Sequence, residues 1–201
     1  MKIEDLASLK GADRLRLALG LDEDQTHKIK VLAESMLGNN PHIKETYVGK
    51  ARPGISFYDF KNNKLGIGHT SSDVLAHEMG HAASLANSSD FYKNLLRGSK
   101  RLTNLSNKAA IPLAALISKF PKITDEQRKQ LLLASAGLSG LAAAPNLFEE
   151  AKASLTAVKH SPTKFRTGMS MIPGIISHGV NDLTAPSTYL IANKLIGDSN
   201  D

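Results

Sequence analysis

The chain has no cysteine and no tryptophan among its 201 residues, and aromatic side chains make up only 5% of it. Without cysteine, disulfide bonds and thiolate zinc sites are excluded, so a metal ion would have to be held by His, Asp or Glu. With so few aromatic residues, a hydrophobic core must consist largely of Leu, Ile, Val and Ala. This composition favours a mainly helical domain.

Acidic residues are outnumbered by basic ones, which gives a formal net charge of +6. The basic residues are spread along the chain, and no aromatic stacking pattern accompanies them. We therefore interpret them as a solvated helix face and expect no nucleic-acid partner. The densest stretch consists of Lys93, Arg97, Lys100, Arg101 and Lys108.

Long apolar segments are also missing. The first ten residues, MKIEDLASLK, have no apolar core of a signal peptide, so an intracellular protein is expected. The apolar run Leu131–Ala144 is shorter than the roughly 20 residues of an ordinary transmembrane helix. We interpret this run, and the shorter run Ala109–Ile117, as buried core helices. The alternative is that the apolar helical hairpin over 109–144 contacts a membrane surface.

The first third of the chain combines helices with one small β region. Residues 1–20 are expected to form one or two short amphipathic helices. A clearer helix is predicted over 22–37, where apolar residues recur every three or four positions, and Gly38–Pro41 ends it. Between 42 and 70, β-branched and aromatic residues predict a hairpin or a three-stranded sheet. The fold class expected is therefore mainly α with a small β-hairpin or sheet (α+β).

The rest of the chain is predicted to be helical. Ser71 and Ser72 are candidate N-caps of the first of these helices. Pro112 is expected to break or kink the second, unless it is one long helix, and Pro145 is expected to end the third. Helices are predicted over 73–86, 88–118, 124–144, 147–159, 168–180 and 184–196.

The sequence His77-Glu78-Met79-Gly80-His81 lies on the predicted helix 73–86. Histidines four residues apart face the same side of a helix and can bind one Zn²⁺ as metal ligands. Glu78 is then placed to act as the catalytic general base toward a water molecule. Gly80 would let another element approach this helix closely. The motif predicts zinc-dependent hydrolysis of a peptide or protein substrate.

A catalytic zinc site needs a third protein ligand and an open fourth position. Positions 84 and 87, where a longer histidine motif would continue, hold Ser84 and Asn87. The third ligand must therefore come from elsewhere, and the best candidate segment is Phe148–Ser154, which contains Glu149 and Glu150.

The segments VLAHEMGHAAS (74–84) and FEEAKASLTA (148–157) resemble the gluzincin metallopeptidases. They look most like the group of the CAAX-type proteases, the bacterial neutral zinc metallopeptidases and the minigluzincins. In that group the third ligand is a Glu in a downstream pattern like E-x-x-A-(D/S). The resemblance implies that Glu150 is the third ligand, because Glu150–Ser154 fits this pattern in register. Glu149 does not fit it, and is expected instead to complete a capping box with Asn146.

The same resemblance implies a zincin-like metallopeptidase domain over 1–160 and a C-terminal helical appendage over 161–201. It implies that Lys64–His69 is an edge strand to which an extended substrate adds. It also implies a residue that stabilises the oxyanion, for which no motif selects one candidate. The residues considered for that role are His69, Tyr58, His160, Arg166 and His178.

Two other functions stay open at the level of the sequence. One is a structural or interaction protein of a larger protein assembly, for example a phage particle, that retains the zinc site as a brace. The long Ala-rich helices and the final 40 residues, which match no peptidase element, motivate it. The other is a membrane-associated protease whose apolar hairpin enters the bilayer.

Overall fold

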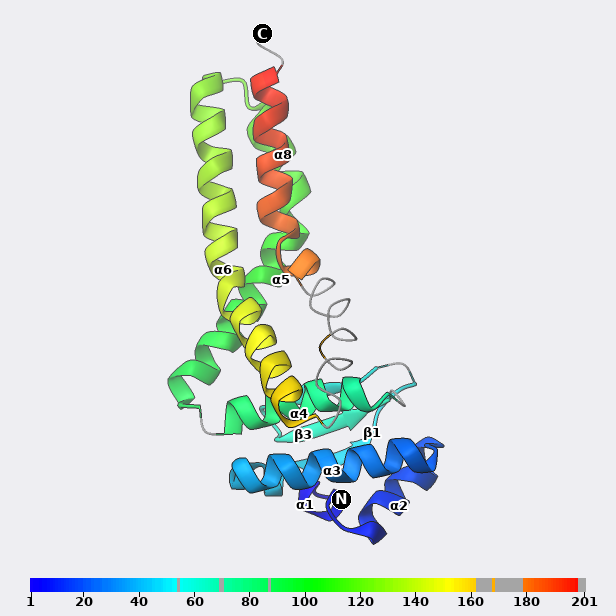
Figure 1. Cartoon of the computed structure of the whole chain (residues 1–201). Coiled ribbons are helices and arrows are strands. Elements are labelled where there is room, and N and C mark those ends of the chain that lie inside the picture. Colours follow the sequence, from blue (N-terminus) through cyan, green and yellow to red (C-terminus); the bar gives the residue numbers. More distant parts are fainter. Residues whose placement is uncertain (54, 69–70, 87, 162–167, 169–178, 199–201) are drawn as a thin grey trace. The chain divides into compact units, whose positions relative to one another are not determined.

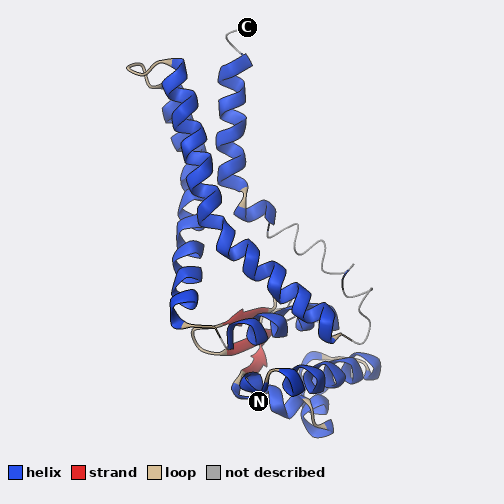
Figure 2. Cartoon of the chain, turned by 60° about the vertical axis from the view of Figure 1, so that its left-hand side comes forward, coloured by secondary structure: helices blue, strands red, loops and turns tan. Residues whose placement is uncertain are grey.

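A computed structural model describes the chain except for residues 54, 69–70, 87, 162–167, 169–178 and 199–201. As predicted, the fold is mainly α with a small three-stranded sheet (Figures 1 and 2). The chain forms two compact units. Unit 1 contains Met1–Lys93 and Glu149–Ile175, and unit 2 contains Asn94–Phe148 and Ile176–Asp201. The domain boundary at residue 160 stays a prediction.

Three helices begin unit 1: α1 (Ile3–Leu6), α2 (Leu9–Leu19) and α3 (Glu23–Asn39). The side chain of Asp22 accepts a hydrogen bond from the Gln25 amide at 2.7 Å, and the Gln25 side chain accepts one from the Asp22 amide at 3.2 Å. This capping box explains where α3 begins. The periodic apolar residues of α3 are buried, as its sequence predicted: Ile29, Leu32, Ala33 and Met36.

A 3₁₀ helix, η1 (Pro41–Glu45), leads into the sheet. Its strands are β1 (Tyr47–Lys50), β2 (Phe57–Asp59) and β3 (Lys64–Ile67), in the order β1-β3-β2. β3 is parallel to β1 and antiparallel to β2. Asn63 makes the turn before β3 with a left-handed backbone (φ 48°), a conformation that asparagine tolerates well.

β3 lies at the centre of the sheet, so the prediction of an edge strand is wrong for Lys64–Ile67. Leu65 pairs with Val48 on one side and with Tyr58 on the other. Leu65 and Ile67 are almost completely buried, whereas the flanking strands are more polar and more exposed. The most apolar strand therefore takes the centre. Because both of its edges are already paired, β3 has no room for a substrate strand.

The metal-site motif lies on α4 (Ser72–Ala86), close to the predicted bounds. The Ser71 hydroxyl accepts a hydrogen bond from the Asp73 amide at 3.3 Å, which caps the start of the helix. One face of α4 is buried in the core of unit 1, and this packing fixes the orientation of the helix about its axis. The buried residues are Leu75, Ala76, Met79, Ala82 and Ala83.

The next two helices run through their prolines. α5 (Asp90–Lys119) contains Pro112, and α6 (Asp125–His160) contains Pro145. The helix predicted from residue 124 begins close to that position, with a capping box in which Gln127 and Thr124 exchange hydrogen bonds of 3.2 and 2.8 Å. The predicted end of the helix at Pro145 is wrong. Helix-forming alanines precede Pro145, and buried positions lie on both sides of it, so packing outweighs the lost backbone hydrogen bond.

Unit 2 is a helical assembly in which parts of α5 and α6 lie beside α8 (Thr184–Asp198) (Figures 1 and 2). α8 matches the predicted segment 184–196, whereas most of 168–180 lies outside the described residues. The expectation that Leu131–Ala144 is a buried helix is only partly correct. Leu132 and Ala143 are buried, but Leu138 and Leu141 are 69% and 73% exposed.

Within the part of the chain that the structure describes, α6 is the one helix whose length and composition would allow it to cross a membrane. Composition alone does not distinguish such a helix from the core helix of a soluble protein. The exposure of its large side chains, rather than its length, is therefore the informative observation.

At Gly80 the backbones of α4 and α6 approach each other closely. A Cβ atom placed on Gly80 would lie 2.2 Å from the carbonyl oxygen of Ala153, well inside van der Waals contact. The predicted role of a small residue at this position is therefore confirmed.

We expect Gly80→Ala to destabilise unit 1 by about 1–3 kcal/mol, because the backbones of two helices would have to separate. Gly38→Ala is the matched control. A Cβ on Gly38 meets no atom within 4 Å, so this change should be neutral or stabilise by roughly 0.5–1 kcal/mol. Urea unfolding followed by circular dichroism measures both, and equal stability of wild type and Gly80→Ala would contradict the close contact.

Candidate metal centre

Three side chains from two helices converge in unit 1. His77 and His81 lie one turn apart on α4, and Glu150 comes from α6. The His77 Nε2 atom is 3.1 Å from the Glu150 Oε2 atom, and the His81 Nε2 atom is 3.5 Å from the same oxygen. One ligand atom from each residue lies within 4.8 Å of the other two. This group could hold a metal ion.

The donor distances fit a tetrahedral metal. With bonds of 2.0–2.1 Å, two ligands of a tetrahedral ion are about 3.3 Å apart. The separations of 3.1 and 3.5 Å lie on either side of this value. The rings of His77 and His81 meet edge to face, with centroids 4.7 Å apart, so both Nε2 atoms can point at one position.

The remaining nitrogen of each histidine ring has its own partner. His77 Nδ1 lies 3.1 Å from the Ser154 hydroxyl oxygen, and His81 Nδ1 lies 3.5 Å from Glu149 Oε1. If Nδ1–H donates to these oxygens when a metal is bound, each ring has its Nε2 atom free to serve as the ligand. Such outer contacts fix the orientation of metal-binding histidines and increase their basicity.

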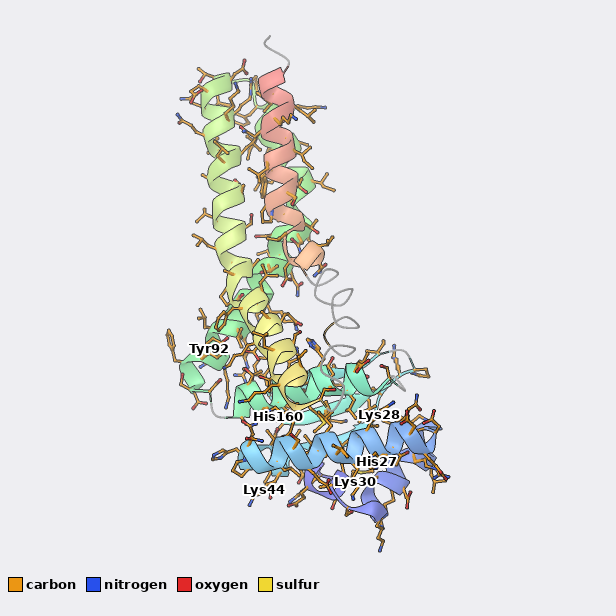
Figure 3. All side chains as sticks on the ribbon, in the orientation of Figure 1. His27, Lys28, Lys30, Lys44, Tyr92 and His160 are labelled. Carbon is orange, nitrogen blue, oxygen red and sulfur yellow. The ribbon has the colours of Figure 1, made fainter. Side chains whose placement is uncertain are left out.

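Glu149 is a buried carboxylate with several hydrogen-bond donors around it. Its Oε2 atom accepts hydrogen bonds from the Ser84 hydroxyl at 3.0 Å and from the Tyr92 hydroxyl at 3.2 Å. Tyr92 lies in the first turn of α5 (Figure 3). Burial, the charge of Glu149 and this hydrogen bond raise the pKa of Tyr92 to about 12, so its phenol remains a donor. Glu149 is thus held rigidly against His81.

Glu149 does not cap a helix, so the role predicted for it is wrong. α6 passes through this position without a new N-terminus, and its amides there are already in the helix. The sequence offered one indication of the true role: Ser84 follows His81 by three residues and so shares its helix face. Tyr92, on a different helix, gave no comparable signal.

Glu78 lies beside His77 on α4, and its carboxylate is close enough to His81 to act on it electrostatically. Burial lowers the pKa of the His81 imidazole. Hydrogen bonds that the Glu149 and Glu150 carboxylates accept from the ring, with the charges of Glu150 and Glu78, outweigh burial and raise that pKa to about 9. Three carboxylates therefore surround the histidine pair, which suits a divalent cation.

Two of the residues considered for oxyanion stabilisation have other partners. His160, at the end of α6 and next to α3 (Figure 3), is buried and its Nδ1 lies 3.1 Å from the Ser35 hydroxyl. The Tyr58 hydroxyl donates to the Asn63 side chain at 2.9 Å. Residues 69, 166 and 178 lie outside the described residues, so no oxyanion residue is selected.

Comparison of the chain with protein-family models, with curated proteins and with solved structures finds no match.

We expect the wild-type chain to bind one metal ion and Glu150→Ala to lose it, because a donor of the cluster is removed. Glu149→Gln should keep the stoichiometry and lower the affinity about 10- to 100-fold, because only the support of His81 is weakened. Elemental analysis after dialysis and titration with a competing chelator measure both quantities.

If Glu149→Ala lost the metal while Glu150→Ala retained it, the assignment of the third ligand would be wrong. Circular dichroism of both variants controls for loss of folding.

The pH dependence of metal binding follows from the pKa of His81, which is raised to about 9. In the metal-free protein, protonated His81 contributes stability that is complete below pH 6.5 and is lost as the pH rises through 9. A metal needs the neutral ring, so its apparent affinity should rise about tenfold per pH unit between pH 6.5 and 8.5. Chelator competition across this range measures the slope. An affinity independent of pH would show that His81 binds no metal.

Proposed function

We propose that this protein is a zinc-dependent peptidase of gluzincin type, with His77, His81 and Glu150 as the zinc ligands. The observation that supports it most directly is the convergence of two imidazole nitrogens and one carboxylate oxygen from two helices. A donor set of two nitrogens and one oxygen at tetrahedral spacing favours zinc over calcium or magnesium, which take more oxygen ligands.

The number of converging donors supports a catalytic site. Structural zinc sites are usually closed by four protein ligands, whereas catalytic sites have three and leave one position for water or substrate. Among the residues that the structure describes, three donors form this group. A metal ion held by these three residues would therefore keep a position for water or substrate.

Each residue then has a defined task. Bound zinc would supply the Lewis acidity that lowers the pKa of a water molecule and polarises a peptide carbonyl. Glu78 accepts the proton that this water loses, and later delivers it to the amine that leaves when the C–N bond breaks. Ser154 and Glu149 keep the two histidine rings oriented throughout.

The resemblance found in the sequence points the same way. The segment Glu150–Ser154 was matched to the third-ligand pattern of gluzincins, and the side chains at both of its ends reach His77. A ligand and an orienting hydroxyl four residues apart on one helix face explain why such a pattern would have this spacing.

We expect Glu78→Gln to retain zinc and to lose cleavage of peptide substrates by at least about 100-fold, because the amide cannot accept the proton. A library of fluorogenic peptides, scored with wild-type protein, supplies the substrate for the comparison. Glu34→Gln on α3 is the matched control, since it removes an exposed carboxylate that pairs with Lys30 away from the site.

Cleavage that survived in Glu78→Gln would contradict Glu78 as the base. Zinc binding without cleavage by any wild-type preparation would instead favour the alternative function, in which zinc braces α4 against α6.

A further inference from the structure

In unit 2, small residues are mostly buried and many large apolar residues are exposed, which is the reverse of the usual arrangement. Its buried positions are occupied mainly by small or hydroxylated residues, with few large apolar side chains among them. The small buried residues are Ser99, Thr103, Ala110, Ala114, Ala136, Ser139, Ala142, Ala143 and Ala185. In unit 1, by contrast, the core contains Ile3, Leu6, Leu32, Met36, Leu65 and Met79.

The large apolar residues of unit 2 instead lie on its outside. On α5 five exposed leucines fall within an arc of roughly 90° on the helix, beside the buried face, whereas the exposed Ile111 lies outside this arc. On α6, Leu131, Leu138, Leu141 and Phe148 are seven, three and seven residues apart and so share one face of the helix, while the exposed Leu133 lies outside it. The exposed set comprises Leu95, Leu102, Leu105, Ile111, Leu113 and Leu116 on α5, Leu131, Leu133, Leu138, Leu141 and Phe148 on α6, and Leu190, Ile191 and Leu195 on α8.

This arrangement suits a helical assembly whose exposed leucines contact lipid. In a bilayer, helices associate through small residues and hydroxyl hydrogen bonds, while Leu and Ile face the acyl chains. Ser99 on α5 donates such a hydrogen bond to the Ala142 carbonyl of α6 at 2.5 Å. Of the most apolar stretch of α6, only 28% is buried, whereas the core helix of a soluble protein would be mostly buried.

The charges of α5 suit an anionic surface. Between residues 94 and 124 there are six basic residues and no acidic ones. Lys100, Arg101 and Lys108 are exposed. By helix geometry Arg101 and Lys108 flank the leucine arc, whereas Lys100 lies on the far side of the buried face. A helix with leucines on one face and Lys or Arg on the other lies in the plane of a membrane interface, with its basic groups at the lipid headgroups.

The same charges argue against α5 crossing the bilayer. The uncharged stretch between Lys108 and Lys119 has ten residues. This is about 15 Å of helix, half the thickness of a hydrocarbon core.

We infer that unit 2 binds the surface of an anionic lipid bilayer, with the exposed leucines of α5 and α6 entering the headgroup–acyl boundary. This inference does not depend on the metal site.

The test uses the full chain and vesicles of phosphatidylcholine with or without phosphatidylglycerol. We expect the wild type to float with the anionic vesicles and much less with the neutral ones. The triple change Leu102→Gln, Leu105→Gln and Leu116→Gln should reduce binding roughly tenfold or more, since three apolar side chains no longer enter the bilayer. Leu17→Gln with Leu155→Gln is the matched control, because both leucines are exposed, at 83% and 70%, but lie in unit 1.

Insertion of a side chain into the bilayer can be measured separately by the fluorescence of an introduced tryptophan, because the chain has no tryptophan of its own. Leu105→Trp should give fluorescence that shifts to the blue and is quenched by brominated lipid, whereas Leu17→Trp should give neither. Circular dichroism and unchanged metal content establish that each variant is folded.

Three results would overturn the inference. The first is flotation no greater than without vesicles. The second is binding that the triple leucine variant does not reduce, which would indicate adsorption by charge alone. The third is a concentration-dependent dimer in sedimentation velocity that the same variant abolishes while no vesicle binding occurs, which would identify a second copy as the partner of this face.

Discussion

The backbone contact between Gly80 of α4 and Ala153 of α6 determines whether the two halves of the candidate metal centre can meet. His81 follows Gly80 directly, and Glu150 precedes Ala153 by one turn, so the contact brings imidazole and carboxylate to ligand distance. A larger residue at position 80 would move the helices apart by more than a metal–ligand bond tolerates. The ligands, their orienting partners and Glu78 all depend on this approach.

The features that depend on interactions within one helical turn could be predicted from the sequence. The capping residues Asp22 and Thr124 act within one helical turn, and both helices begin where they were expected. The spacing of His77 and His81 is likewise fixed by helix geometry alone. Glu150 was predicted as a ligand from the resemblance of its segment to the gluzincin pattern, not from helix geometry. The structure places it beside both histidines.

The predictions from the sequence were wrong where the structure depends on contacts between residues far apart in the chain. The central position of β3 depends on pairing with β1 and β2, which no local pattern reveals. Pro145 was expected to end a helix, but buried residues on both sides of it continue α6. The role of Glu149 depends on Tyr92, a residue 57 positions away. The leucines of unit 2 follow a helical pattern, but only the structure shows which of them remain uncovered.

The hydrogen bond between Tyr92 and Glu149 has a further consequence for how such a chain can diversify. Unit 1 is interrupted after Lys93 and resumes at Glu149, so the hydrogen bond ties together the two points at which the segment 94–148 leaves and re-enters this unit. Insertions are tolerated best where their ends are close and anchored in the host domain. The length and surface chemistry of this segment can therefore change without moving the side chains of the candidate metal centre.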